Sequence, residues 1–311
     1  KNQIPVVTTM MGIGSMPTEH SMYFGMVGNN GKPYANRAMN EADVVIMVGA
    51  RVADRAFNRP EIIATNKTLV HMDVDPAEIG KNAGPHIPIV GDAKYIFEDM
   101  EQYAIDGDYS QWIETLNEYK KEMEPVRKPN PEFVDPAAFI VKLSKMMDED
   151  GIYVADVGQN QIWSCGYHVV RKGKFLTTGG MGTMGYSIPA AMGAKYACKD
   201  KQVVAVCGDG SFQMSMMEFA TMRQHGINSK VIVLKNTYLG MVRQFQHYNY
   251  KDQYSVVDLS GSPDLECIAN AYGMKFIRLE NMTNVEEKIQ EFLQDDEAVL
   301  MECIIDPMDL V

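Results

Sequence analysis

The sequence predicts an α/β protein built from two doubly wound, mostly parallel sheets. Short apolar runs rich in β-branched residues recur along the chain, as buried strands of parallel sheets do. Helical patterns separate these runs, which is the alternation expected of βαβ units. A stretch rich in proline and charge interrupts the alternation at 124–135. We therefore expect a first domain at 1–123, a linker at 124–135 and a second domain at 136–311.

Three apolar runs, at 5–9, 44–48 and 69–74, are the strands predicted in the first half. Helices are predicted from 92 to about 103 and at 107–121, where apolar residues recur at helical spacing. Arg51 and Asp73 fall at strand ends, where α/β sheets bind ligands. A guanidinium suits a pyrophosphate, and a carboxylate suits a pair of ribose hydroxyls. The alternative is that these groups simply face water, and no Gly-x-Gly-x-x-Gly marks a standard dinucleotide site.

The second half continues the alternation, beginning with a helix behind Asp135-Pro136. Glycine-rich turns are predicted at 158–160 and 180–185. The predicted strands are 152–156, 202–207, 230–234, 275–279 and 298–305. The predicted helices are 137–147, 188–198, 214–224, 240–250, 264–272 and 285–293.

The most informative stretch is Gly-Asp-Gly-Ser at 208–211, with Asn236 following Asp209 by 27 positions. A buried strand precedes each, so a carboxylate and a carboxamide reach the same sheet edge. These hard oxygen ligands are too few to enclose a cation, but they suit Mg²⁺ held together with phosphate oxygens. The amides of Gly210 and Ser211 at a helix start suit a phosphate. The alternative is an ordinary tight turn with an Asp cap.

Composition and charge exclude several classes of protein. Hydrophobic residues make up 46% of the 311, enough for sizeable cores, yet no apolar run of 18 residues predicts a membrane span. The net charge of −12 argues against non-specific nucleic-acid binding. Five cysteines without paired-ligand spacing predict free thiols and a reducing, cytoplasmic location. The first residues lack the apolar region of a signal peptide.

Several motifs resemble one family. Gly-Asp-Gly at 208–210 followed by Asn236 resembles the diphosphate and metal motif of thiamine-diphosphate (ThDP) enzymes. The segments 157–161, 179–186 and 238–246 resemble the acetolactate synthase large subunit, and the likeness covers nearly the whole chain. It implies an enzyme of branched-chain amino-acid biosynthesis that decarboxylates pyruvate and condenses it with a second 2-keto acid. It also implies a homo-dimer or tetramer with a small regulatory subunit as a further partner. Another ThDP-dependent decarboxylase, oxidase or carboligase, or a silent assembly fragment, is the alternative.

The resemblance also implies which residues hold ThDP and Mg²⁺. It assigns Asp209, Asn236 and Tyr238 to the metal, and the flexible thioether of Met184 to supporting the cofactor's conformation. Phe245 stands where the family has a Trp that recognises the second keto acid. Asn160 replaces a His, and Lys235 replaces the first of two Asn. The implied ThDP-binding residues are Val157, Gly158, Gln159, Asn160, Gly182, Met184, Gly210, Ser211, Leu239, Gly240 and Met241.

The first half resembles part of the family's FAD-contacting middle domain. Asn29-Asn30 replaces a Met-His pair, and the glycine-rich FAD segment expected before Lys1 is absent. We therefore expect an incomplete FAD site. The residues implied to contact FAD are Thr9, Met10, Met11, Gly49, Arg51, Asp54, Arg55, Asp73, Val74, Asp92 and Ala93.

The family's acid/base group is a Glu on a pyrimidine-binding domain that no segment of this chain resembles. We therefore assign no catalytic acid or base within the chain and expect it to be truncated at its N-terminus. ThDP needs its C2 proton removed with acid–base help from a group within hydrogen-bond reach. The chain alone is accordingly expected to be inactive.

Overall fold

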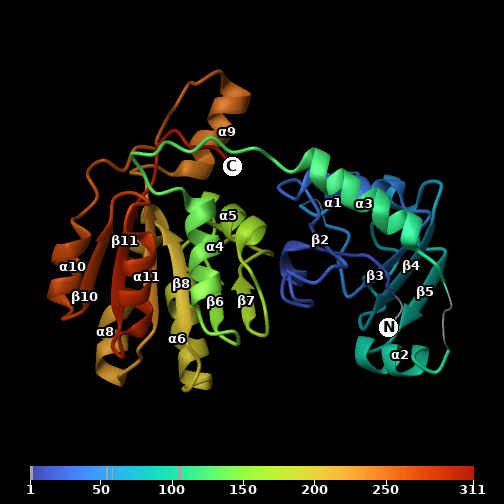
Figure 1. Cartoon of the computed structure of the whole chain (residues 1–311), viewed down its shortest axis with the longest axis horizontal. Helices are drawn as coiled ribbons and strands as arrows, with labels where there is room; N and C mark the ends of the chain where they lie inside the picture. The colour runs from blue at the N-terminus through green and yellow to red at the C-terminus, as the bar shows by residue number, and fades with distance from the viewer. Residues whose placement is uncertain (1–2, 54, 58, 104–106) are drawn as a thin grey trace. The chain divides into compact units, whose positions relative to one another are not determined.

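The computed structural model describes residues 3–53, 55–57, 59–103 and 107–311. The chain divides into two compact units, Lys1–Val126 and Arg127–Val311, and each is described by itself. All strand pairs within the described sheets are parallel, and helices alternate with the strands (Figure 1). The predicted α/β class is confirmed.

The N-terminal unit contains two small parallel sheets rather than the single sheet that was predicted. One pairs β1 (Val6–Thr8) with β2 (Tyr23–Met26), and the other is β3 (Val44–Val48), β4 (Thr68–Asp73) and β5 (Ile87–Val90), in that order. Its helices are η1 (Met10–Gly12), α1 (Pro33–Glu41), η2 (Pro60–Ala64), α2 (Ala93–Met100) and α3 (Ser110–Met123). The prediction missed β2 and β5, because strands of four residues carry little periodicity. It also missed the helix α1.

The C-terminal unit is built on one six-stranded sheet in the order β10-β11-β9-β8-β6-β7. The strands are β6 (Ile152–Ala155), β7 (Lys174–Thr177), β8 (Val203–Gly208), β9 (Lys230–Lys235), β10 (Lys275–Leu279) and β11 (Val299–Ile304). The helices are α4 (Pro136–Met146), α5 (Gln159–Tyr167), α6 (Ser187–Ala197), α7 (Asp209–Ser215), α8 (Glu218–His225), α9 (Gly240–Tyr250), α10 (Leu265–Ala271) and α11 (Val285–Gln294).

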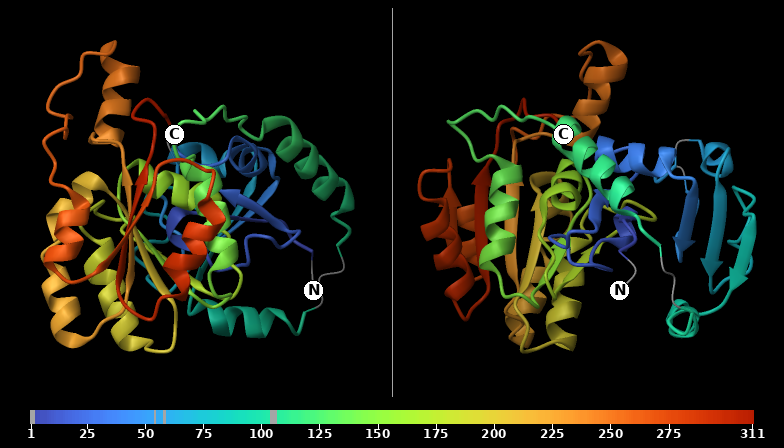
Figure 2. Two further views of the ribbon diagram at one scale, coloured as in Figure 1. Left: turned by 60° about the vertical axis from the view of Figure 1, so that its left-hand side comes forward. Right: turned by 45° about the vertical axis from the view of Figure 1, so that its right-hand side comes forward.

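Helices cover both faces of this sheet (Figures 1 and 2). On one face, alternate strand residues such as Val154, Cys207 and Val233 pack with α6, α7, α8 and α10 in a single apolar core. On the other face lie α4, α5 and α11 (Figures 1 and 2). Alternation of side chains along each strand therefore decides which of the two layers a residue joins.

The strand order places a topological switch point between β6 and β8 at one edge of the sheet, which is where a crevice forms in open α/β sheets. From β6 the chain passes to β7 on one side, and β8 then pairs with β6 on the other side. The loops that follow β6 and β8 therefore lead away from each other at the carboxyl ends of neighbouring strands. Ligands bind at such switch points in open α/β sheets.

Two predicted boundaries are wrong. Gln159 and Asn160 were placed in a turn, whereas α5 begins at Gln159. The single helix predicted at 214–224 is two helices: α7 begins at Asp209, immediately after β8, and α8 begins at Glu218. No glycine or proline marks the break between them, so sequence pattern had no signal for it.

Two composition-based expectations can be compared with the structure. All five cysteines are free, and Cys165, Cys207 and Cys303 are buried. Within the described residues, no helix is both long enough and apolar enough to cross a membrane.

Candidate functional site

Asp209 lies directly after β8 and is the first residue of α7. Its side chain is buried, with 3% of its surface exposed. Oxygen Oδ1 accepts the amide of Gly210 at 3.0 Å, and Oδ2 accepts the amide of Thr237 at 2.7 Å. The second bond connects the carboxyl ends of β8 and β9, which are neighbouring strands. The carboxylate is thus held from two sides.

Asn236 follows β9 at the same edge and is also buried. Its Oδ1 accepts the amide of Tyr238 at 2.9 Å, and its Nδ2 donates to Gln159 Oε1 at 3.4 Å. Thr237, which lies between Asn236 and Tyr238 in the chain, has a φ of 61°. This backbone conformation is rare for a β-branched residue and costs about 1–3 kcal/mol. This conformation lets two consecutive residues contact Asp209 and Gln159 from one tight turn.

Tyr238 is held by an isolated antiparallel bridge to Asp258. The two hydrogen bonds of this bridge use the amide of Leu239 and the carbonyl of Thr237. The Tyr238 carbonyl takes no part in them.

Gln159 connects the ends of β6 and β9 with α9. Its Nε2 donates to Gln244 Oε1 at 2.9 Å and to the Asp309 carbonyl at 3.0 Å, while its Oε1 faces Asn236. A Cβ added to Gly240 would lie 2.0 Å from that Oε1. Glycine at 240 is therefore required by a close approach rather than by its backbone angles.

Open space lies beside two glycines at the crevice. A Cβ added to Gly158, after β6, or to Gly208, at the end of β8, would meet no atom within 4 Å. Gly158 has a φ of 112°, a value that favours glycine. The crevice between β6 and β8 thus has room for a ligand to approach the backbone.

Met184 lies close to Gly210 and Leu239. A Cβ built on Gly210 would lie 3.2 Å from Met184 Cε and 2.8 Å from Leu239 Cδ2. The predicted residues Met184, Gly210 and Leu239 therefore come together, although they belong to three separate segments. Asp156, directly after β6, holds the segment that follows Met184, because its carboxylate accepts the amides of Gly185 at 3.1 Å and Ser187 at 2.7 Å.

The remaining predicted ThDP residues differ in what they offer. Asn160 donates both amide hydrogens internally, to the carbonyls of Asp156 at 2.9 Å and Val206 at 3.0 Å. Phe245 is 56% exposed on α9, 5.9 Å from the ring of Tyr250. The Val157 amide donates to the Asp156 carboxylate, and Gly182 has a φ of 62°. Ser211 is buried in α7, and Met241 is the second residue of α9.

Burial dominates the electrostatics of Asp209. It raises the pKa of this carboxyl from 3.8 to about 6, and the bonds from Thr237 and Gly210 and the charge of Lys235 offset only part of that rise. A desolvated carboxylate gains from a cation placed beside it. Carboxylate and carboxamide oxygens are the ligand types that Mg²⁺ accepts. Within the described residues, no cluster of three or more His, Cys, Asp or Glu side chains forms a metal cage.

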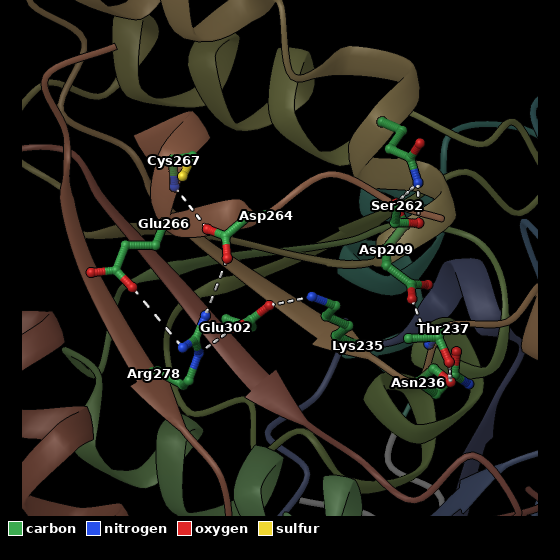
Figure 3. A network of polar contacts seen from close by, with 11 residues as sticks. Asp209, Lys235, Asn236, Thr237, Ser262, Asp264, Glu266, Cys267, Arg278 and Glu302 are labelled. Carbon is green, nitrogen blue, oxygen red and sulfur yellow. Dashed lines mark hydrogen bonds and ion pairs between the residues drawn. The ribbon is translucent and has the colours of Figure 1, made fainter. Parts of the chain in front are cut away.

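A charged network lies next to Asp209 (Figure 3). Lys235, the last residue of β9, donates from Nζ to Glu302 Oε1 at 2.7 Å, and Arg278 donates from Nε to Glu302 Oε2 at 2.6 Å. Glu302, in β11, is fully buried, whereas Arg278 is 38% exposed. The buried carboxylate is thus satisfied by two cations on the strands that flank it.

The predicted FAD residues lie at strand ends of the N-terminal unit. Gly49 and Arg51 follow β3, Asp73 ends β4, and Asp92 follows β5. Asp73 Oδ1 accepts the amide of Asp75 at 2.9 Å, and Asp92 caps α2 through Lys94 at 2.8 Å. Val74 and Met11 are exposed. Thr9 comes directly before η1, Met10 is the first residue of η1, and Ala93 is the first residue of α2. The backbone carbonyl of Arg55 accepts a hydrogen bond from the amide of Asn29. Asp54 lies outside the described residues.

A cavity of about 110 Å³ lies elsewhere in the C-terminal unit. Its lining includes Asn228, Met274 and Ala298, which precede β9, β10 and β11. It is therefore at the amino edge of the sheet, opposite the edge that carries Asp209 and Asn236.

Sequence reasoning missed Asp156, Thr237 and Glu302 as parts of the site. Asp156 had a usable signal, because an acid directly after a buried strand and before a glycine marks a strand end worth examining. Thr237 and Glu302 had none, since a left-handed Thr and a buried Glu in a strand contradict the preferences of their residue types.

Two domain models of one enzyme family match this chain. The model of the thiamine pyrophosphate enzyme central domain matches residues 1–100, and that of the C-terminal TPP binding domain matches residues 156–303. The chain belongs to the thiamine pyrophosphate enzymes. Within that family it is similar to acetolactate synthase large subunits, which confirms the resemblance seen in its motifs.

Three relatives illustrate the similarity. The probable acetolactate synthase large subunit of Methanococcus aeolicus is 37% identical over 98% of the chain and 54% of the relative. The large subunit of Lactococcus lactis subsp. lactis is 37% identical over 98% and 53%, and the acetolactate synthase of Arthrospira platensis is 36% identical over 96% and 53%. The chain spans about half the length of the curated relatives it matches.

Proposed function

We propose that this chain supplies the diphosphate- and cation-binding half of the ThDP site in an acetolactate synthase-type carboligase. The carrying observation is that buried Asp209 is bonded to Thr237 across two strand ends, next to Asn236. This arrangement lies beside the crevice between β6 and β8, where open space adjoins Gly158 and Gly208. The geometry fits a cation bridged to phosphate oxygens.

The residues present have the right donor and acceptor types for Mg²⁺-ThDP. Asp209, Asn236 and the Tyr238 carbonyl would hold the cation, while backbone amides near Gly158 and the amide of Ser211 would face the diphosphate. The Gly210 amide is already bonded to Asp209. Met184 and Leu239, which approach Gly210, would contact the cofactor through apolar atoms. When bound, ThDP supplies the electron sink that a 2-keto acid needs for decarboxylation.

We further propose the substrates and assembly of the complete enzyme. Pyruvate and a second 2-keto acid are the substrates, Phe245 contacts the second one, and the enzyme is a cytoplasmic homo-dimer or tetramer that also binds FAD and a small regulatory subunit. Similarity to acetolactate synthase large subunits supports the substrates. Free, buried thiols support a reducing compartment.

A binding titration tests the proposed site. Calorimetry of the chain with ThDP and Mg²⁺ should give binding that Asp209→Ala weakens by about a hundredfold, because a buried charged ligand is lost. Asn236→Ala should weaken it less, since the lost ligand is neutral. Binding that is the same in Asp209→Ala as in the unaltered chain would place the cation elsewhere.

An activity assay tests the division of labour. The chain incubated with pyruvate, Mg²⁺, ThDP and FAD should form no acetolactate, because we assign it no acid or base for the cofactor's aminopyrimidine. Adding the matching N-terminal segment of a relative should restore turnover. Turnover by the chain alone at an ordinary enzyme rate would mean that it carries an acid/base residue we have not identified.

A further inference from the structure

Lys235 lies between two buried carboxylates, Asp209 directly after β8 and Glu302 in β11. Gly208 of β8 pairs with Leu234 of β9, so Asp209 follows beside Lys235 on one side. On the other side Ile304 of β11 pairs with Lys235, and Glu302, two residues earlier in β11, points to the same face. One ammonium group therefore has two carboxylates near it, one directly after β8 and one in β11.

The structure shows which carboxylate Lys235 contacts. Its Nζ donates to Glu302 Oε1 at 2.7 Å, and in Figure 3 its side chain extends toward Glu302 and away from Asp209. Glu302 is anchored from its other side by Arg278, which itself lies 4.0 Å from Asp264 and Glu266. Glu302 is therefore a fixed hydrogen-bond acceptor. It is 0% exposed and belongs to β11, which lies between β10 and β9 in the sheet.

Asp209 is the other buried carboxylate beside Lys235, and the charge of Lys235 already acts on it by lowering its pKa. A lysine carries its charge on a flexible four-carbon stem, so it can follow whichever partner is available. An ammonium paired with Asp209 would occupy the carboxylate that we assign to the cation, and would repel a divalent ion at short range.

We propose that Glu302 is a positioning residue that holds the Lys235 ammonium away from Asp209 and so keeps this carboxylate available to a divalent cation. The proposal rests on the proposed cation site at Asp209 and Asn236. It assigns a specific task to a lysine that stands immediately before the proposed cation ligand Asn236, and to a buried glutamate outside the proposed ligand set. Arg278 contributes to this positioning, because it donates a hydrogen bond to Glu302 and holds its carboxylate in place.

Mn²⁺ binding measures the competition directly, because the signal of free Mn²⁺ in electron paramagnetic resonance falls as the ion binds. Mn²⁺ accepts the same oxygen ligands as Mg²⁺. Glu302→Gln should weaken Mn²⁺ binding about tenfold, because it releases Lys235 toward Asp209. Lys235→Met should tighten it severalfold, and the double variant should return to within about twofold of the Lys235→Met value.

Controls separate this proposal from the cation site itself. Lys275→Met removes a lysine that pairs with Asp295 and Glu291 at the amino end of β10, and it should leave Mn²⁺ binding unchanged. Asp209→Asn should abolish Mn²⁺ binding. If it does not, the cation site is wrong, and the proposed function fails first.

Three results would overturn the positioning role while leaving the cation site intact. The first is unchanged Mn²⁺ binding in Glu302→Gln. The second is a double variant that binds as weakly as Glu302→Gln, which indicates that Glu302 acts only through folding. The third is weaker binding in Lys235→Met, which decides the matter even if Glu302→Gln fails to fold by circular dichroism.

Discussion

The carboxyl edges of the sheets in the two units carry similar residues but use them differently. In the N-terminal unit, Asp73 and Asp92 each accept an amide only two residues further along. In the C-terminal unit, Asp209 accepts an amide 28 residues away, and Asn236 contacts a side chain 77 residues away. Asp92 is exposed, whereas Asp209 is buried.

The two kinds of contact have different consequences for the arrangement of the side chains. A bond between residues two apart stabilises its own turn or helix start, and it would form in almost any fold. A bond between strand ends forms only when the whole sheet is assembled, so it fixes the relative positions of ligands before anything binds. The side chains at the C-terminal edge are therefore fixed by the assembled sheet, while those at the N-terminal edge mainly stabilise their own loops.

The largest expected effect comes from disturbing the long-range contacts. Gly240→Ala places a Cβ 2.0 Å from Gln159 Oε1 and 2.9 Å from Asn236 Nδ2. Gln159 is tied to Gln244 and Asp309, so moving it costs hydrogen bonds. We expect Mn²⁺ binding to weaken more than about tenfold and unfolding free energy to fall by about 1–3 kcal/mol.

Gly193→Ala is the matched control for that change. Gly193 lies inside α6, and an added Cβ meets no atom within 4 Å. It should stabilise the chain by up to about 1 kcal/mol in urea unfolding, because alanine favours helix. Unchanged Mn²⁺ binding in Gly240→Ala would show that the Gln159–Asn236 contact is not part of the site.

The burial of Asp209 should make stability and binding oppose each other. The pKa of Asp209 is about 6 in the folded chain and 3.8 for an ordinary, solvent-exposed Asp. The folded state therefore binds more protons than the unfolded state between these pH values. The ionised carboxyl therefore costs stability fully above pH 6, and the cost disappears as the pH falls below 4. Asp209→Asn should raise the unfolding free energy by up to about 2 kcal/mol at pH 8 and have little effect at pH 4.

Thermal unfolding with EDTA present measures that pH dependence. For the unaltered chain, Mn²⁺ affinity should also fall as the pH drops below about 6, because the cation must displace the proton on Asp209. An Asp209→Asn variant that is equally destabilised at both pH values would mean that the carboxylate is stabilising in the folded chain.

Helix caps in the two units offer a smaller test. Asp92→Ala removes the cap of α2 and should cost about 1 kcal/mol in urea unfolding. Asp135 caps α4 and also pairs with Arg127 at 3.2 Å, which in turn bridges Asp309. Asp135→Ala should therefore cost more than Asp92→Ala. Equal costs would weaken the contrast between local and long-range contacts.

The smallest expected effect is on flavin. Because the acids at the N-terminal edge cap their own loops, we expect the purified chain to be colourless, and Arg51→Ala to leave its spectrum unchanged. A flavin absorbance band near stoichiometric with protein would show that this edge is a complete site.

Local sequence pattern was enough to identify the strands that lead to Asp209 and Asn236. Apolar, β-branched runs define buried strands, and polar residues directly after them must fall at one edge of a parallel sheet. The Gly-Asp-Gly motif and the following Asn236 were therefore placed correctly at neighbouring strand ends without any coordinates.

Partner choice was decided only by the tertiary structure. The resemblance implies that Asn160 binds ThDP, and only the structure shows that both of its side-chain amide hydrogens go to backbone carbonyls, at the end of β6 and in β8. Lys235 selects Glu302 over Asp209 through the register of β8, β9 and β11. Sequence determines which groups are present and which elements carry them. Which of several chemically equivalent partners a group meets depends on strand register and burial, which join residues far apart in the chain.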